Sequence, residues 1–266
     1  MIDPILSAAL PLALIASSLL PALVIFTLAE GSVRLRTTLN LLGALSKLLL
    51  VGLMLWGVYH KLAFEARFEL LPNLPLVLRA DELSLLFITL SALLWFLTTI
   101  YAVGYLEQSP YRSRFFGFFT LCVTATVGIA MAGNLFTFIL FYEMLTLSTY
   151  PLVVHRGTGV ARRAGEIYLL YTVLGGVLLL LGAVWLYALA GTLEFRPQGI
   201  VSHLERTQHA ALIGIFVLLI GGLGVKAALL PLHGWLPEAM VAPAPVSALL
   251  HAVAVVKAGA FGIVRV

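Results

Sequence analysis

The sequence predicts an all-α protein, a polytopic bundle of about eight transmembrane helices with a discontinuous seventh helix. Of its 266 residues, 61% are hydrophobic and only 11% are charged, whereas about 25% of the residues in a soluble domain are charged. The mean hydropathy is +1.07. The net charge of +4 is a modest excess that orientation signals explain better than nucleic-acid binding does, so no nucleic-acid partner is expected.

Eight stretches meet or approach the length of about 20 mainly apolar residues that a membrane span needs. In chain order, they cover residues 4–29, 38–59, 83–107, 114–133, 135–155, 165–190, 210–231 and 245–265. The first is expected to remain as a helix, because it lacks the basic region and the cleavage site of a signal peptide. Gly133 and Asn134 predict a very tight turn between the fourth and fifth helices. Residues 1–266 are therefore expected to form a single transmembrane domain.

The two longest connections are expected at about 60–82 and 191–209. The first contains Pro72 and Pro75, and its residues alternate in part between apolar and charged. A short interfacial hairpin or helix is therefore expected there.

The distribution of Lys and Arg between the loops predicts the topology. With the N-terminus outside, the inner loops carry seven basic residues and the outer loops carry five. The inner residues are Arg34, Arg36, Arg112, Arg114, Arg156, Arg162 and Arg163, and the outer residues are Lys61, Arg67, Arg79, Arg196 and Arg206. The outer five lie in the two longest connections, which carry less weight in this rule. We therefore expect a multi-pass protein of the cell inner (plasma) membrane with its N-terminus outside.

The seventh stretch cannot be one regular helix, because Pro231 and Pro237 each remove a backbone donor and clash with the preceding turn. We expect the break at residues 230–237, and Pro243 and Pro245 follow soon after it. An apolar segment interrupted by Pro and Gly is typical of a transport site, because broken backbone in a membrane must be satisfied by protein or water.

Three charged residues lie inside predicted spans, where an ionisable group costs about 2.5–3.5 kcal/mol on insertion scales. They are Glu143, Lys226 and Lys257. Such groups are expected in a protein interior or a hydrated path, which indicates ion movement through the membrane, with a proton as the first candidate. The structural alternatives are a neutral Glu143 bonded to a neighbouring helix and a Lys226 that snorkels to the interface.

Two histidines extend this predicted proton pathway. His251 precedes Lys257 by six residues, which is about 120° around and about 9 Å along a regular helix, so water could bridge the two side chains. His233 lies at the predicted break. Either ring could instead be only a hydrogen-bond partner, for a neighbouring helix or for freed carbonyls. Lys47, about ten residues into the second stretch, is a weaker candidate.

No motif for a cofactor, a metal or a catalytic centre is found in the sequence. There is no GxGxxG, Walker A, HExxH or GxSxG pattern. The one cysteine, Cys122, excludes an internal disulfide and a CxxC site. No cofactor or metal is therefore expected, and any electron chemistry is expected to belong to other subunits.

Several segments resemble the antiporter-like, proton-conducting subunits shared by respiratory complex I, Mrp-type sodium/proton antiporters and membrane-bound hydrogenases. The most specific are residues 224–239 (GVKAALLPLHGWLPEA), 244–251 (APVSALLH) and 256–262 (VKAGAFG). Weaker ones are residues 81–87 (DELSLLF) and 134–143, and the resemblance covers most of the chain. Among the branches, the chain looks closest to the Mrp-type D subunit and its relatives.

The resemblance implies a role for each buried charge. It implies that Glu143 and Lys226 form a charge pair and that Lys257, with His251, continues a hydrated proton path. It also implies N-terminal helices at 1–110, followed at 111–266 by the first antiporter-like repeat and part of a central relay. Members of this family usually have about fourteen helices with two inverted repeats. The expected alternatives are a truncated product, one half of a split subunit, and a fragment that needs a partner chain for the second repeat.

The sequence thus predicts a proton-translocating membrane subunit of a multi-subunit monovalent cation/proton antiporter or complex I-like system. The expected ions are protons, with Na+ as a further candidate. The expected partners are other membrane subunits of an Mrp-like or NADH:quinone oxidoreductase-like assembly. Two alternatives stay open: a non-conducting assembly subunit, and the membrane subunit of an inorganic-carbon uptake pump with a soluble zinc protein as its partner.

Overall fold

Eight helical segments in the described part of the chain are long and apolar enough to span a membrane, which confirms the predicted fold class. The structure is a computed structural model that describes residues 4–71, 74–106, 109–196, 199–200 and 209–266. The first seven spans are α1 (Pro4–Thr27), α2 (Val33–Tyr59), α3 (Glu82–Tyr105), α4 (Arg112–Ala130), α5 (Leu135–Val153), α6 (Gly159–Ala190) and α7 (His209–Lys226). The eighth, Ala244–Arg265, combines three shorter helices.

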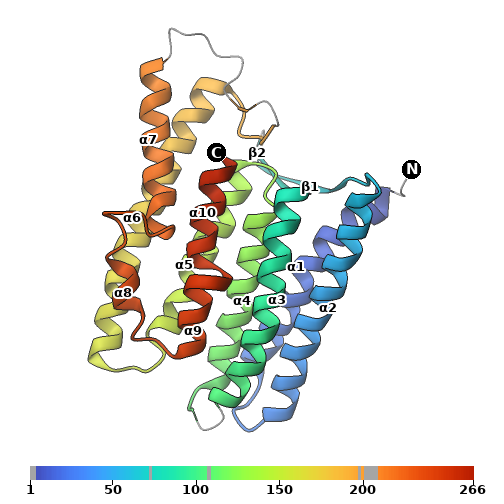
Figure 1. Cartoon of the computed structure of the whole chain (residues 1–266), viewed down its shortest axis with the longest axis vertical. Coiled ribbons are helices and arrows are strands. Elements are labelled where there is room, and N and C mark those ends of the chain that lie inside the picture. The colour runs from blue at the N-terminus through green and yellow to red at the C-terminus, as the bar shows by residue number, and fades with distance from the viewer. Residues whose placement is uncertain (1–3, 72–73, 107–108, 197–198, 201–208) are drawn as a thin grey trace.

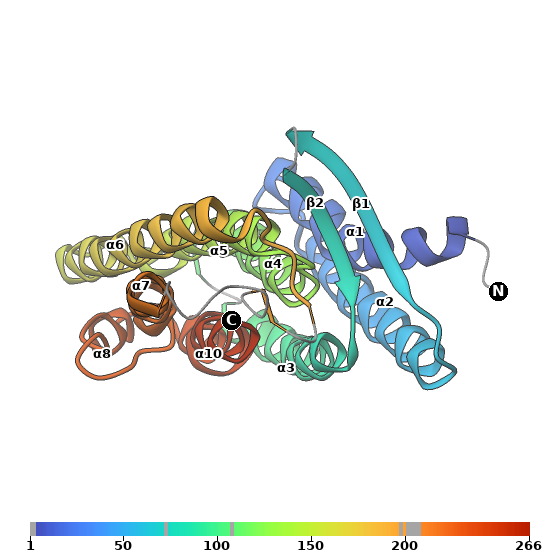
Figure 2. The ribbon, with the colours of Figure 1, turned by 90° about the horizontal axis from the view of Figure 1, so that it is seen from above.

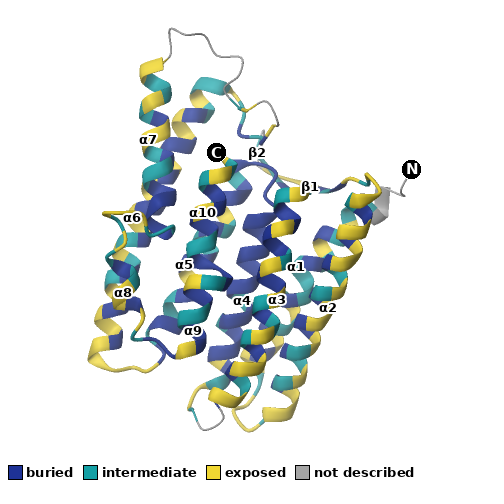
Figure 3. Cartoon of the chain, in the orientation of Figure 1, coloured by how far each residue is buried: buried dark blue, intermediate teal, exposed yellow. Residues whose placement is uncertain are grey.

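Helix α4 lies at the centre of the bundle (Figure 1) and packs against α1, α3 and α5. Of the residues in its most apolar window, 83% are buried, against 28% in α1. Seen from above, α6, α5 and α4 follow one another, with α7, α10 and α3 along one side (Figure 2). The outer faces of the peripheral helices are exposed and rich in Leu and Val (Figure 3). Lipid is the expected neighbour of these faces.

A β-hairpin covers one end of the bundle and corresponds to the interfacial element predicted at 60–82. Strand β1 (Phe64–Leu71) pairs antiparallel with β2 (Leu74–Ala80). The turn between α4 and α5 extends this sheet, because Leu78 forms a bridge with Ala132. The turn that joins these two helices is therefore attached to the hairpin.

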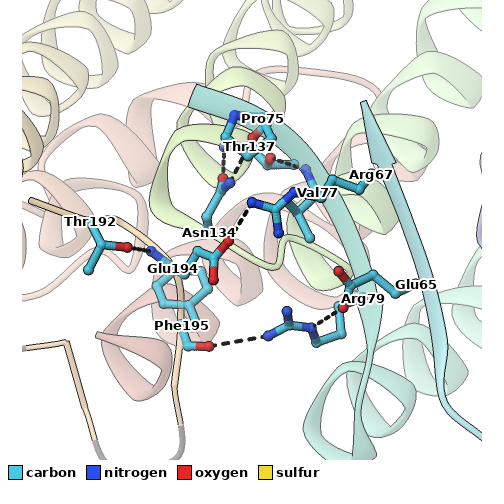
Figure 4. Close-up of polar contacts among 10 residues, drawn as sticks. All are labelled: Glu65, Arg67, Pro75, Val77, Arg79, Asn134, Thr137, Thr192, Glu194 and Phe195. Atoms are coloured by element: carbon cyan, nitrogen blue, oxygen red, sulfur yellow. Dashed lines mark hydrogen bonds and ion pairs between the residues drawn. The ribbon is translucent and has the colours of Figure 1, made fainter. Parts of the chain in front are cut away.

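The predicted tight turn at Gly133 and Asn134 is present and explains this junction (Figure 4). Asn134 caps α5 by accepting a 2.7 Å hydrogen bond from the Thr137 amide, and it donates another of 2.7 Å to the Pro75 carbonyl. The Thr137 hydroxyl in turn accepts a 2.9 Å bond from the Val77 amide. The start of α5 is therefore fixed to the hairpin.

Ion pairs connect the hairpin to the segment that follows α6 (Figure 4). Arg67 pairs with Glu194 at 2.8 Å, and Arg79 pairs with Glu65 at 2.7 Å while donating to the Phe195 carbonyl at 3.3 Å. The hairpin, the α4–α5 turn and the segment that follows α6 therefore meet at this end of the bundle.

The predicted break in the seventh helix is present, but α7 ends at Lys226, before the expected residues 230–237. A proline ring clashes with the carbonyl four residues earlier and disfavours helical backbone just before it, so Pro231 ends the regular ladder near residue 227. Ala228 then adopts a left-handed conformation, with φ of 55°. The chain continues through turns into the short helix α8 (Trp235–Ala239).

The eighth span is also broken, which corrects the prediction of one continuous helix at 245–265. It consists of α9 (Ala244–Ala248), a π-helical turn η2 (Leu249–Val253) and α10 (Val255–Arg265). At Val253, the carbonyl accepts a 3.0 Å hydrogen bond from the Ser91 hydroxyl of α3. Because this contact is tertiary and no proline or glycine lies at 249–254, local sequence does not reveal the break. The regular-helix spacing assumed for His251 and Lys257 is therefore wrong.

Candidate functional site

Glu143 lies on the side of α5 that faces α6. Its carboxylate rests against Gly176, where a Cβ atom would lie 2.9 Å from the carboxyl carbon and 3.2 Å from Oε2. Oε1 is buried and has no hydrogen-bond partner. Glycine at 176 therefore provides the space in which this acid sits, and the acid keeps an acceptor free.

Lys226 is fully buried, with 0% of its surface exposed, and is the last residue of α7. Its Nζ donates to the main-chain carbonyl of Tyr142, the residue before Glu143, and lies 3.3 Å from the centre of the Tyr142 ring. The Tyr142 hydroxyl donates back to the Gly222 carbonyl at 3.2 Å. Tyr142 thus joins α5 to the end of α7, and sequence reasoning missed it because an aromatic in an apolar run carries no distinguishing signal.

The break after Lys226 is satisfied from within the protein. Trp235 is fully buried, and its indole Nε1 donates a 2.7 Å hydrogen bond to the Val225 carbonyl at the end of the helix, which also accepts a 3.1 Å bond from the Ala228 amide. Its ring also meets the Tyr168 ring edge-on, with 5.4 Å between the ring centres. Interrupted backbone at membrane depth needs such partners.

Glu143 and Lys226 are neighbours without being a direct ion pair. Between the two, no nitrogen–oxygen contact within 4.0 Å is present, and the ion pairs of the described residues lie elsewhere. Lys226 nevertheless reaches the backbone beside Glu143, because it donates to the carbonyl of Tyr142, the preceding residue. The charge pair that the resemblance implies is thus an arrangement around Tyr142, whose carbonyl accepts from Lys226, while the Glu143 Oε1 has no partner among the described residues.

Lys257 lies on α10, close to the end of α7. Gly259 packs directly on the backbone there, since a Cβ atom at this glycine would lie 2.8 Å from the Ala227 Cα. Lys226 and Lys257 both fall within two residues of this helix crossing. The Lys257 Nζ is buried without a hydrogen-bond partner, and it lies 5.9 Å from the centre of the Phe87 ring.

The two candidate histidines are at the surface of the chain. His233 lies in the turns between α7 and α8, and His251 lies in the π-helical turn. Both are exposed, and neither ring has a hydrogen bond to the described residues. Their role in a proton path stays a prediction.

An apolar groove of about 340 Å³ leads to Glu143 between α5 and α6. It meets a second, polar pocket of about 640 Å³ beneath the hairpin, which Arg67 and Glu194 help to line. The two cavities share three lining residues, namely Leu74, Tyr187 and Leu193. These three residues connect the surroundings of Glu143 with the hairpin end of the molecule.

Lys47, the weaker candidate, is also fully buried. Its Nζ donates a 2.7 Å hydrogen bond to the Ser18 hydroxyl and lies 5.3 Å from the centre of the Trp95 ring. Ser18 also accepts a 2.9 Å bond from Thr124. This polar cluster lies between α1, α2, α3 and α4, on the far side of α4 from Lys226. In the described residues, no group of three or more His, Cys, Asp or Glu could hold a metal ion.

Two parts of the chain match known protein families. Residues 132–266 match the family described as NADH:quinone oxidoreductase/Mrp antiporter, TM. Residues 72–116 match the family described as NADH-Ubiquinone oxidoreductase (complex I), chain 5 N-terminus.

The curated relatives include antiporter subunit mnhA2 from strains of Staphylococcus aureus. The MRSA252 protein is 34% identical over 191 residues, which is 71% of this chain and 24% of that protein. The JH9 protein is 33% identical over 196 residues, or 73% of this chain and 24% of that protein. The chain therefore spans about a quarter of the length of these relatives. The resemblance in the sequence favoured the D subunit, whereas these relatives carry the name mnhA2.

Two solved structures share the fold. A chain of the membrane-bound sulfane sulfur reductase, an archaeal respiratory membrane complex, superposes with a TM-score of 0.84 at 25% identity, covering 96% of this chain and 52% of that chain. A chain of the Mrp complex from Dietzia sp. DQ12-45-1b gives a TM-score of 0.80 at 26% identity, covering 97% and 28%.

Proposed function

The chain belongs to the NADH:quinone oxidoreductase/Mrp antiporter family of transmembrane subunits, and we propose that it moves protons within a multi-subunit cation/proton antiporter or complex I-like assembly. Lys226 is the group that gains and loses the proton, and Glu143 biases it. Chains of similar fold belong to an Mrp complex and to a respiratory membrane complex, which supports an assembly of this kind.

The burial of Lys226 at the end of α7 is the observation that carries this proposal. For a buried amine, burial favours the neutral form and a nearby carboxylate favours the charged form, so small changes nearby alter its protonation. The neutral Tyr142 carbonyl and ring hold the amine without neutralising it. The Glu143 Oε1 has no partner among the described residues, so it can accept a hydrogen bond from water or from a neighbouring side chain.

The cavities support a route for the proton. A proton enters at the polar pocket beneath the hairpin and reaches Glu143 along the groove between α5 and α6. It then passes by way of Lys226 across the crossing of α7 and α10 to Lys257. His251 and His233, exposed near this crossing, exchange protons with water or with a neighbouring subunit.

We further propose that residues 1–266 act as one transmembrane domain whose part from 111 onward is the proton-conducting repeat. Other membrane subunits of the assembly complete the path, and Na+ is the coupled ion in an Mrp-type assembly. The excess of arginine in the short loops favours an N-terminus and a hairpin on the outer side of the plasma membrane.

Proton flux into vesicles that hold the native complex tests the role of Lys226. The variant Lys226→Met keeps the length of the side chain and removes its charge, so we expect flux to fall to the level of empty vesicles. Lys61→Met removes an exposed lysine between α2 and β1 and serves as the matched control. Its flux is expected to equal that of the wild type.

The measurement also separates conduction from assembly. If Lys226→Met is present in the membrane at the wild-type level and its flux is unchanged, Lys226 carries no proton. If Glu143→Gln also leaves the flux unchanged, the chain is a non-conducting assembly subunit, and the proposal is wrong.

A further inference from the structure

A third pocket, of about 570 Å³, lies at the end of the bundle opposite the hairpin. It is formed where α3 ends, where α4 begins and where the chain leaves α5. Tyr105, Ser109, Tyr111, Arg114, His155 and Arg156 line it. None of the proposed proton carriers contributes to it, so it is distinct from the site described above.

The described lining of this pocket is positively charged. Arg114 and Arg156 are both exposed, and neither forms an ion pair with the residues that the structure describes. The Arg114 guanidinium lies 5.0 Å from the centre of the Tyr111 ring, which presents its donors beside the pocket. The described residues that line the pocket include no carboxylate. Two guanidinium groups without an anionic partner are suited to an oxyanion with several acceptor oxygens.

His155 adds a buried ring nitrogen that has no hydrogen-bond partner among the described residues. It is 7% exposed, and its Nδ1 is buried without a partner, while its Nε2 lies 3.5 Å from the Ser109 hydroxyl. Burial, and then the charge of Arg114, lower the pKa of His155 to about 4, although Glu30 opposes the shift. Glu30 is itself engaged, because its oxygens accept the backbone amides at the start of α4. An anion in the pocket would supply the missing partner.

The pocket continues onto a lipid-facing surface of α3. Leu97, Tyr101 and Tyr105 follow one another at intervals of four residues and are 53%, 52% and 45% exposed. Side chains at this spacing form one stripe along a helix, so an apolar chain that starts at the pocket can run along it. Tyrosines near the end of a span are typical of the level of the headgroups.

We infer that this pocket binds the phosphate of an anionic phospholipid headgroup, with its acyl chain along the exposed stripe of α3. Arg114 and Arg156 hold the phosphate oxygens, and His155 donates to one of them. The seven arginines predicted for the inner loops lie in or beside the three connections at this end, and together they add to a field that attracts anionic lipid. Pro243, just before α9, also lines the pocket, so the bound lipid would contact the start of the broken eighth span.

Titration of the purified native complex with phosphatidylglycerol, followed by native mass spectrometry, tests this site. We expect the wild type to bind phosphatidylglycerol at least about tenfold more tightly than phosphatidylcholine with the same chains. The double variant Arg114→Gln/Arg156→Gln is expected to lose this preference. Arg162→Gln/Arg163→Gln removes two exposed arginines at the same end that do not line the pocket, and is expected to retain it.

A second variant keeps the test valid if the arginine variant fails to assemble. His155→Phe preserves the ring that packs against Phe115, with 5.1 Å between the ring centres, and removes the two nitrogens. It is expected to weaken phosphatidylglycerol binding about threefold. Equal binding by the wild type and both pocket variants would overturn the inference. Inorganic phosphate that binds alone as tightly as the lipid would overturn the lipid assignment, as would cross-linking of residue 114 to another subunit with no lipid bound.

Discussion

The space that Gly176 leaves for Glu143 offers a way to disturb the proton path without changing a charge. In Gly176→Ala, the new Cβ would lie 2.9 Å from the Glu143 carboxyl carbon, whereas carbon atoms in favourable contact are about 3.5–4.0 Å apart. The carboxyl group must therefore move by about 1 Å. Overpacking of this kind costs about 1–3 kcal/mol, and replacing a helical glycine by alanine returns about 1 kcal/mol.

We expect Gly176→Ala to lower the stability by about 0 to 2 kcal/mol, which is the cost of overpacking less the gain from alanine. We also expect it to lower proton flux at least about tenfold, because a 1 Å displacement of a reacting group can cost up to about 100-fold in rate. Gly52→Ala is the matched control, since a Cβ atom there meets nothing within 4 Å. It is expected to leave the flux unchanged. Flux in vesicles and thermal unfolding of the complex are the two measurements.

A third variant decides whether the carboxylate is the cause. Adding Glu143→Asp to Gly176→Ala shortens the acid by one methylene and relieves the contact with the new methyl group. We expect Glu143→Asp to raise the stability of the Gly176→Ala variant by more than it lowers the stability of the wild type. If Gly176→Ala behaves like Gly52→Ala in both assays, the position of the Glu143 carboxylate does not matter for transport, and the reasoning is refuted.

Two further predictions concern the broken helices. Trp235→Phe removes one of two donors to the buried Val225 carbonyl, because the Ala228 amide also bonds to it at 3.1 Å, so thermal unfolding should show a loss of about 0.5–1.5 kcal/mol; an unchanged stability would contradict a structural role for the indole hydrogen bond. Burial raises the pKa of Asp81, but hydrogen bonds from Ser84 and the 2.5 Å ion pair with Arg265 outweigh it and hold that pKa below its usual value. The stability from this group is therefore present above the unfolded pKa of about 3.9 and is lost as the pH falls through the folded value. The unfolding temperature of Asp81→Asn should vary less with acid pH than that of the wild type, and equal slopes would contradict the assignment.

The extent to which the sequence predicts the fold depends on the kind of signal. Spans follow from apolar length alone, and the break in the seventh helix follows from Pro231, because both are local properties. The π-helical turn at Leu249–Val253 depends on the Ser91 hydroxyl of a distant helix, so no local pattern predicts it. The hairpin was one of two options, and its pairing with the α4–α5 turn selects it.

The candidate site divides in the same way. The cost of a charge in a membrane singles out Glu143, Lys226 and Lys257, whatever their surroundings. It does not predict that Tyr142 lies between the first two, or that Gly176 accommodates the acid, since both are contacts between helices. The same cost did not separate Lys226 from Lys47, which the sequence ranked lower and which is equally buried.

The partners of the buried charges distinguish these two lysines. Lys47 donates to the Ser18 hydroxyl, which is itself bonded to Thr124, and a satisfied polar network of this kind holds neighbouring helices in one arrangement. Glu143 and Lys257 each keep a buried polar atom without a partner, on either side of Lys226. Buried polar groups are normally satisfied, and exceptions call for a functional explanation. Groups that exchange a proton must change partners, so a set that is incompletely satisfied at rest is what a relay requires. This contrast supports the proposal that protons move on the α5–α7–α10 side of the bundle and that Lys47 has a structural role, and Lys47→Met is expected to conduct normally where Lys226→Met does not.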